Sequence, residues 1–185
     1  MTKLIFASTN ENKATEVTDI LKASGIDICW KKLDIVEIQD PDISKVAKFK
    51  GMEAYKILKA PVLVEDTGLH IKSMNDYPGS LTKHFYRSIG LEGILDFLKG
   101  KPRGALAVTT FAFCDNDGVK TFTGEVEGTI SEHIAKKTWF DWDVIFIPKG
   151  YDRTYAELPR GEKNSISQRR KAIDKFLLWY TTKKV

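Results

Sequence analysis

The sequence predicts an α/β fold, and three observations lead to that class. Residues 4–7 form a short apolar run of the kind that is buried in a sheet, and residues 14–21 then repeat apolar side chains at helical spacing. A second helical segment, 43–58, precedes another short apolar run at 62–64. Two longer strand-like runs follow in the second half of the chain, joined by an Asp-Gly pair that favours a tight hairpin. Strands that alternate with helices indicate a sheet covered by helices.

Length and composition fit one globular domain over residues 1–185. The chain has 185 residues, 42% of them hydrophobic, and a chain of this size buries about 70% of the surface that its unfolded form exposes. The formal charge of +4 suits anionic ligands but is too small and dispersed to indicate a nucleic-acid groove. Cys29 and Cys114 show neither a zinc spacing nor a disulfide framework. No apolar run approaches the about 20 residues of a membrane span, and the apolar run near the N-terminus is shorter than the apolar region of a signal peptide. We therefore expect a cytoplasmic protein without membrane or nucleic-acid partners.

The first strand and helix frame a polar loop, residues 8–13. The loop should bring backbone N–H groups and the positive end of a helix dipole together, an arrangement that suits phosphate. Asn10 also has the side chain of a helix N-cap, so it could serve only to begin the helix. The two roles are compatible. Gly25 stands where a C-cap would release the chain.

Two acids follow the apolar run at 62–64. A strand is expected near 28–33, and the helix at 43–58 should end before Pro61. The run at 62–64 is then the next predicted strand, and Glu65 and Asp66 come at its C-terminal end. Ligands of open α/β sheets gather at the carboxyl ends of strands, so this position indicates function.

The remaining elements complete the predicted sheet. Pro78-Gly79 marks a turn, and residues 91–98 predict a short helix. Strands are expected at 105–113 and 119–126, and again at 144–147 before Pro148. The last helix should begin near Asn164 or Ser165, with five side chains facing inward: Ile166, Ile173, Phe176, Leu177 and Tyr180.

The acids allow a magnesium interpretation beside a structural one. Mg²⁺ prefers oxygen ligands and binds one or two carboxylates together with substrate phosphates, which suits Asp66. Asp66 before Thr67-Gly68 could equally form an Asx-type turn. Glu37 and Glu65, taken singly, would more often be surface acids.

A late segment, 139–143, combines three aromatic residues with two acids. Its rings could stack on a nucleobase, a contact worth roughly 1–3 kcal/mol per base, although a core role for one or more of them is at least as consistent with composition. Lys163, Arg169 and Arg170 could bind a base or phosphate, or could simply be solvated. The three histidines have no metal-ligand spacing, so we expect none of them to be catalytic: His70, His84 and His133.

Read together, several motifs resemble the inosine triphosphate pyrophosphatase family, which includes the xanthosine and deoxyinosine triphosphate diphosphatases. They occur in family order and spacing over nearly the whole chain: 8–13 (STNENK), 64–69 (VEDTGL), 77–79 (YPG), 140–148 (FDWDVIFIP), 154–158 (TYAEL) and 162–169 (EKNSISQR).

The resemblance implies an elongated, two-lobed α/β fold in which helices flank a long curved mixed sheet and a central cleft, and it implies a homodimer. It implies hydrolysis of purine nucleoside triphosphates such as ITP, dITP and XTP to the monophosphate and pyrophosphate, in house-cleaning of the nucleotide pool. Water would attack the α-phosphorus, oriented or deprotonated by Asp66 or Glu65.

The resemblance also assigns roles to individual residues. It implies that Glu37 and Asp66 bind Mg²⁺. The triphosphate would be held by the loop residues and two lysines: Ser8, Thr9, Asn10, Lys13 and Lys50. Phe140 would stack on the base, and five further residues would line the base and sugar end: Asp143, Lys163, Ser167, Gln168 and Arg169.

Three residues depart from the family pattern. Asp141 replaces a glycine, Val144 a proline and Gln168 the histidine of a Ser-His-Arg motif. Gln168 carries both a donor and an acceptor, and Asp141 adds an acceptor that could favour an amino group. We therefore hypothesise weaker discrimination against ordinary purines than is normal in the family. Two alternatives remain, a nucleotide sensor with little turnover and a pyrophosphatase for other modified nucleotides.

Overall fold

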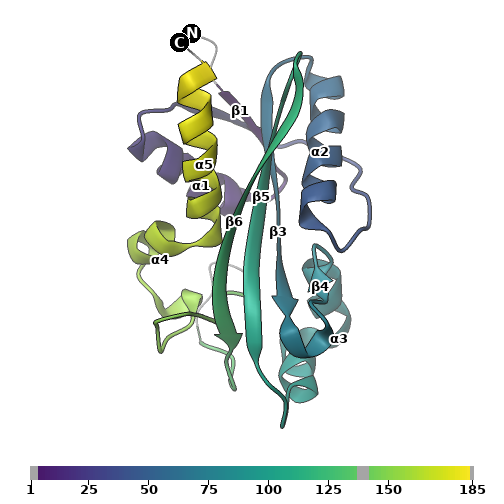
Figure 1. The fold of residues 1–185 in the computed structure, drawn as a ribbon, viewed down its shortest axis with the longest axis vertical. Helices are drawn as coiled ribbons and strands as arrows, with labels where there is room; N and C mark the ends of the chain where they lie inside the picture. The colour runs from purple at the N-terminus through teal and green to yellow at the C-terminus, as the bar shows by residue number, and fades with distance from the viewer. Residues whose placement is uncertain (1–3, 137–141, 184–185) are drawn as a thin grey trace.

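The computed structural model describes residues 4–136 and 142–183, which form a mixed sheet with helices on both faces (Figure 1). The seven-stranded sheet has the order β2-β1-β3-β5-β6-β7, and β4 pairs with β3. β1, β2 and the start of β3 are parallel, and the other pairings are antiparallel. The strands are β1 (Leu4–Ala7), β2 (Ile28–Lys31), β3 (Val62–Ile71), β4 (Pro78–Gly79), β5 (Gly104–Asp115), β6 (Gly118–Ile130) and β7 (Phe146–Pro148). The predicted α/β class with a long mixed sheet is confirmed.

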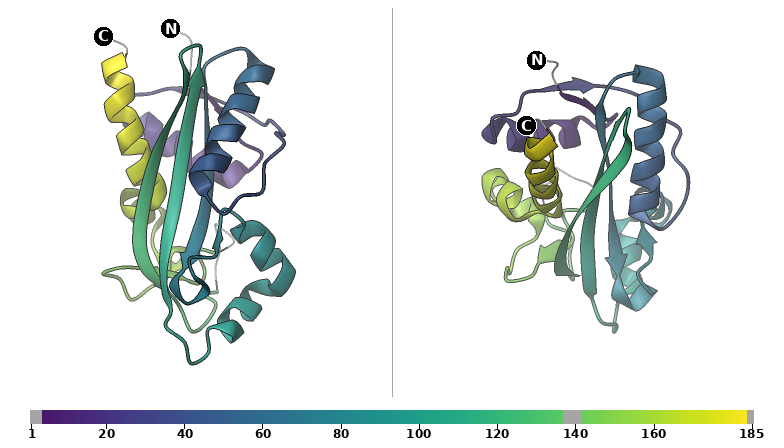
Figure 2. Two further views of the ribbon diagram at one scale, coloured as in Figure 1. Left: turned by 45° about the vertical axis from the view of Figure 1, so that its right-hand side comes forward. Right: turned by 45° about the horizontal axis from the view of Figure 1, so that its top comes forward.

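The helices cover the two faces of the sheet unequally. They are α1 (Glu11–Ala23), α2 (Ile43–Leu58), α3 (Thr82–Phe97), α4 (Arg160–Ile166) and α5 (Gln168–Lys183), with 3₁₀ turns at Lys72–Met74 and Tyr155–Glu157. Helices α1 and α5 pack on one face of the long strands, and α2 packs on the other (Figures 1 and 2). Among the described helices, none has the length and apolar character that crossing a membrane would require.

Side-chain caps explain where the first two helices begin, and the cap at Asn10 was predicted from the sequence. The Asn10 side chain accepts a hydrogen bond from Lys13 N at 3.1 Å, which satisfies one of the unpaired N–H groups at the start of α1. Asp42 accepts from Ser44 N at 2.8 Å at the start of α2, and Lys59 ends that helix in the left-handed conformation. The predicted bounds of α2 are confirmed.

Strand β3 is longer than the sequence predicted, and this changes the position of the acids. It pairs with β1 only at Val62 and Leu63, but it pairs with β5 at every residue through Ile71. The prediction that the strand ends before Glu65 is therefore wrong. Backbone pairing does not require an apolar side chain, and β5 provides hydrogen-bond partners along the whole length.

Several other boundaries differ from prediction. Helix α3 begins at Thr82 and bends at Gly90, where φ is 74°, so the predicted helix at 91–98 is only its second part. Strand β7 begins at Phe146 and includes Pro148, because Val144 and Ile145 are buried in a turn instead. The last helix is two helices, α4 and α5, separated by Ser167 at a ψ of 156°. The predicted hairpin between β5 and β6 is confirmed, and it closes at the Asp115–Gly118 pair.

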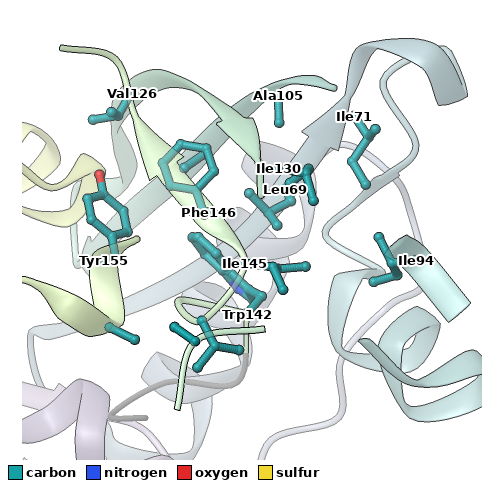
Figure 3. Close-up of a cluster of buried hydrophobic side chains, with 14 of the residues drawn as sticks. Leu69, Ile71, Ile94, Ala105, Val126, Ile130, Trp142, Ile145, Phe146 and Tyr155 are labelled. Atoms are coloured by element: carbon teal, nitrogen blue, oxygen red, sulfur yellow. The ribbon is translucent and has the colours of Figure 1, made fainter. Parts of the chain in front are cut away.

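One core cluster lies at the end of the sheet farthest from the chain termini, and it includes an aromatic group (Figure 3). The Trp142 ring meets Phe146 edge-on at 5.8 Å between centroids, and Tyr155 lies 5.0 Å from Phe146. Trp142 is only 6% exposed. The interpretation that at least one ring of segment 139–143 belongs to the core is confirmed for Trp142. Phe140 and Asp141 lie outside the described residues.

Candidate active site

Glu65 and Asp66 stand next to each other in the middle of β3, and they serve opposite faces of the sheet. Successive side chains of a strand point to opposite sides. Glu65 contacts Lys13 of α1 and Arg169 of α5, whereas Asp66 lines a pocket together with residues of α2. The site therefore has two halves that meet at one strand.

Glu65 is held by two cations. Arg169 donates from Nε to Glu65 Oε2 at 2.7 Å and from Nη2 to Oε1 at 3.0 Å. Lys13 Nζ lies 3.0 Å from the same Oε1. Burial alone would raise the pKa of Glu65, but Arg169 and then Lys13 outweigh it and lower the pKa to about 2. Glu65 is therefore ionised, and its contacts with Arg169 and Lys13 fix its position.

The ion pairs continue from Arg169 toward the base end proposed from the resemblance. Arg169 Nη1 lies 2.8 Å from Glu16 Oε2, and Lys163 Nζ lies 3.4 Å from the same oxygen. Lys163 also pairs with Asp143. We call the six residues the ion-pair chain: Lys13, Glu65, Arg169, Glu16, Lys163 and Asp143. All but Lys13 are buried.

Sequence reasoning missed Glu16. It is 4% exposed and lies on the buried side of α1 beside Val17. An acid within the apolar stripe of a helix is a signal, since a buried carboxylate needs a partner, but the sequence does not show which cation supplies it. Arg169 and Lys163 lower the pKa of Glu16 in spite of its burial.

A close approach between β6 and α5 fixes where Arg169 lies. A Cβ on Gly124 would be 2.1 Å from Gln168 O and 2.4 Å from Ala172 N. Only glycine therefore lets α5 lie this near the strand. Ser167 Oγ accepts from Arg170 N at 3.1 Å, which satisfies a donor in the first turn of α5.

Asp66 lines a second region, a pocket of about 270 Å³. Glu37, Lys50 and Thr9 line the same pocket, and Lys50 forms an ion pair with Glu37. Burial raises the pKa of Asp66 to about 6, although Lys13 and Lys50 act in the opposite direction. Asp66 Oδ2 is buried and has no hydrogen-bond partner among the described residues.

The donor set of this pocket fits a hard divalent cation. Asp66 and Glu37 supply carboxylate oxygens, and the unpartnered Oδ2 of Asp66 is the kind of atom that a bound cation satisfies. Within the described residues, no three acids, histidines or cysteines gather into a metal-holding group. Mg²⁺ uses few protein ligands and takes the rest from phosphates and water, so the carboxylates of Asp66 and Glu37 suit it.

The loop between β1 and α1 is held in a defined shape. Ser8 is buried, its Oγ accepts from Asn10 N at 3.1 Å, and its carbonyl oxygen accepts from Trp30 Nε1 at 2.9 Å. At the other end of the site, Gln168 is 2% exposed and its Oε1 has no hydrogen-bond partner among the described residues.

The fold and site together define an α/β protein with a cation-lined, acid-containing pocket on one side of a sheet strand and a buried ion-pair chain on the other. The chain belongs to the Ham1 family, whose model matches residues 4–179.

Several relatives share most of its length. It is 38% identical over 175 residues to the dITP/XTP pyrophosphatase of Saccharolobus solfataricus, covering 94% of this chain and 91% of the relative. It is 42% identical over 189 residues to the inosine triphosphate pyrophosphatase of Scheffersomyces stipitis, covering 95% and 96%. Among solved structures, a HAM1 protein from Coxiella burnetii superposes with a TM-score of 0.83 at 27% identity, covering 98% of this chain and 100% of the other. The resemblance and the fold that it implied are confirmed.

Proposed function

We propose that this chain hydrolyses deaminated purine nucleoside triphosphates, such as dITP, ITP and XTP, to the monophosphate and pyrophosphate. Membership of the Ham1 family and the names of its relatives support the reaction. The observation that carries the proposal is the pocket around Asp66, where lysines and a carboxylate oxygen with no partner in the described part of the chain line one cavity. Such a pocket can receive a cation together with a polyphosphate.

The triphosphate would lie along the loop at the start of α1. Lys13 and Lys50 would offset its charge, and the positive end of the α1 dipole would attract it. Ser8, Thr9 and Asn10 shape the loop so that its backbone and side chains can contact phosphate oxygens.

Glu37 and Asp66 would hold Mg²⁺. The bound ion would neutralise charge that develops on the phosphate oxygens during displacement. Lys50, which pairs with Glu37, would contact the same phosphates.

Asp66 is the better of the two acids to accept the proton of the attacking water. Both oxygens of Glu65 accept hydrogen bonds from Arg169, and one of them also pairs with Lys13, whereas Asp66 Oδ2 has no hydrogen-bond partner among the described residues. A carboxylate has two oxygens, so one can contact the cation while the other receives the proton. The pyrophosphate leaves in line, and no covalent enzyme intermediate forms.

The base would bind at the opposite end of the ion-pair chain. Arg169 and Lys163 are donors that match the 6-keto oxygen of hypoxanthine or xanthine, whereas the 6-amino group of adenine is itself a donor and offers these cations no acceptor. Asp143, Ser167 and Gln168 would complete this end, and Phe140 would stack on the base.

The test is pyrophosphate release from a panel of nucleotides, with Mg²⁺ and with a chelator. We expect release from dITP and XTP only when Mg²⁺ is present. Tight nucleotide binding without release would instead identify a sensor. Preferred release from a modified pyrimidine nucleotide would point to a different substrate class.

We further infer a cytoplasmic homodimer, following the family resemblance. Cys29 and Cys114 are both free thiols, the form that a reducing compartment maintains. Sedimentation analysis tests the assembly, and a mass near the 20.9 kDa of a single chain would contradict it.

A further inference from the structure

One oxygen of Glu65 is shared by cations from the two ends of the site. Glu65 Oε1 lies 3.0 Å from Lys13 Nζ and accepts from Arg169 Nη2 at 3.0 Å. Its other oxygen accepts from Arg169 Nε at 2.7 Å. The carboxylate is only 1% exposed as a side chain, so these cations hold it in place of water.

The two cations come from different parts of the chain and serve different ends of the proposed nucleotide site. Lys13 belongs to the first turn of α1, beside the phosphate loop. Arg169 belongs to the first turn of α5, at the proposed base end. Any displacement of one cation therefore changes the charge and position that Glu65 offers to the other.

We propose that Glu65 is a positioning residue that couples the two ends of the nucleotide site, orienting Arg169 toward the base while restraining Lys13 and offsetting part of its charge. This inference rests on the proposed function, because it assigns the base to Arg169 and the triphosphate to Lys13. It gives Glu65 a role other than deprotonation of water.

The proposal predicts opposite effects on the two ends when the charge of Glu65 is removed. A neutral side chain beside Lys13 leaves the ammonium charge uncompensated, which strengthens attraction for a polyanion. The same change loosens the two hydrogen bonds that orient Arg169, which weakens discrimination between bases. A defect in folding alone would weaken both kinds of binding.

Glu16 provides the matched control. It is also a buried carboxylate that pairs with Arg169, at 2.8 Å, but its second cation is Lys163 at the base end. Glu16→Gln should therefore change base discrimination without changing binding of the triphosphate tail.

The experiment measures binding by calorimetry with three probes that require no turnover: inorganic triphosphate, and the α,β-methylene analogues of dITP and dATP. For Glu65→Gln we expect inorganic triphosphate to bind about threefold more tightly or better, and the dITP-to-dATP affinity ratio to fall about tenfold. For Glu16→Gln we expect the ratio to fall while triphosphate affinity stays within about twofold. If Glu65→Gln does not fold, Glu65→Asp keeps the negative charge but withdraws the carboxylate from Arg169, so the dITP-to-dATP affinity ratio should still fall.

The inference is overturned if Glu65→Gln leaves the base ratio unchanged, if it weakens triphosphate binding, or if Glu16→Gln alters triphosphate binding as strongly. An unchanged ratio in a folded Glu65→Asp variant overturns it as well. Hydrolysis by the native chain is measured separately, so a lack of turnover would refute the proposed function and leave the binding results interpretable.

Discussion

Arg169 Nη1 lies 2.8 Å from Glu16 Oε2, and this contact joins the first turn of α5 to the middle of α1. Both side chains are buried. Segments from the two ends of the sequence thus meet at the ion-pair chain, and the geometry of the proposed base end depends on their packing.

Replacing Glu16 by alanine should destabilise the protein markedly. The change removes a carboxylate that pairs with both Arg169 and Lys163 in a buried setting, and breaking a buried ion pair costs about 3–5 kcal/mol. Urea unfolding measures the loss. Asp174→Ala, which removes a largely exposed partner of Arg170 in the same helix, should cost less than about 1 kcal/mol. Equal losses of unfolding free energy in the two variants would show that the buried ion pairs of Glu16 stabilise the protein no more than the exposed pair does.

Asp66 should make the metal-free protein less stable as pH rises. Its folded pKa is raised from 3.8 to about 6, so between these values the folded state binds more protons than the unfolded state, and stability falls with increasing pH. Asp66→Asn lacks this titration. The unfolding free energy of the native protein relative to this variant should drop by on the order of 2–3 kcal/mol between pH 4 and pH 7 in a chelator. A parallel pH dependence of the two proteins would contradict the raised pKa.

Gly124→Ala should push α5 away from β6. The added Cβ would meet backbone atoms of Gln168 and Ala172 at 2.1 and 2.4 Å, which cannot rotate aside. We expect a loss of about 1–3 kcal/mol in unfolding free energy, together with a lower kcat/KM, because Arg169 moves with the helix. Gly161→Ala is the control, since a Cβ there has no neighbour within 4 Å and α4 should gain about 0.5–1 kcal/mol. Retention of full activity by Gly124→Ala would show that the position of α5 is unimportant for the site.

Base discrimination should be modest in this protein and should increase on substitution of Gln168. Its buried Oε1, which has no hydrogen-bond partner in residues 4–136 and 142–183, is an acceptor that a 6-amino group could satisfy. We expect the ratio of kcat/KM for dITP over dATP to be below about a thousandfold, and Gln168→His to raise it. Steady-state kinetics on one preparation with dITP, XTP, dGTP and dATP measures this. A native ratio beyond about a thousandfold would refute the hypothesis of relaxed specificity.

The sequence predicted an element correctly where the residues that begin or end it lie a few positions apart in the chain. Asp42 and Asn10 begin their helices by accepting nearby backbone N–H groups, and the Asp-Gly turn joins two strands that pair directly. Each of these features depends on residues a few positions apart. The predicted bounds of α2 and the presence of the hairpin were therefore correct, whereas β6 continues to Ile130 instead of ending at residue 126.

Long-range partners explain what the sequence could not predict. Strand β3 continues past Glu65 and Asp66 because β5 pairs with it there, and β5 lies about forty residues farther along the chain. The pairing of Glu16 with Arg169 joins the two ends of the chain, and no local pattern specifies it. The first half of α3 was missed because its start at Leu81 has no side-chain cap.

The position of bond cleavage tests the central claim most directly. If the triphosphate lies in the Asp66 pocket so that water attacks the α-phosphorus, hydrolysis of dITP in ¹⁸O-labelled water with Mg²⁺ should place the label in the monophosphate and leave the pyrophosphate unlabelled. Mass spectrometry of the products reads this out, and Asp66→Asn should release almost no product. Label in pyrophosphate, or release of orthophosphate with a diphosphate product, would contradict the account.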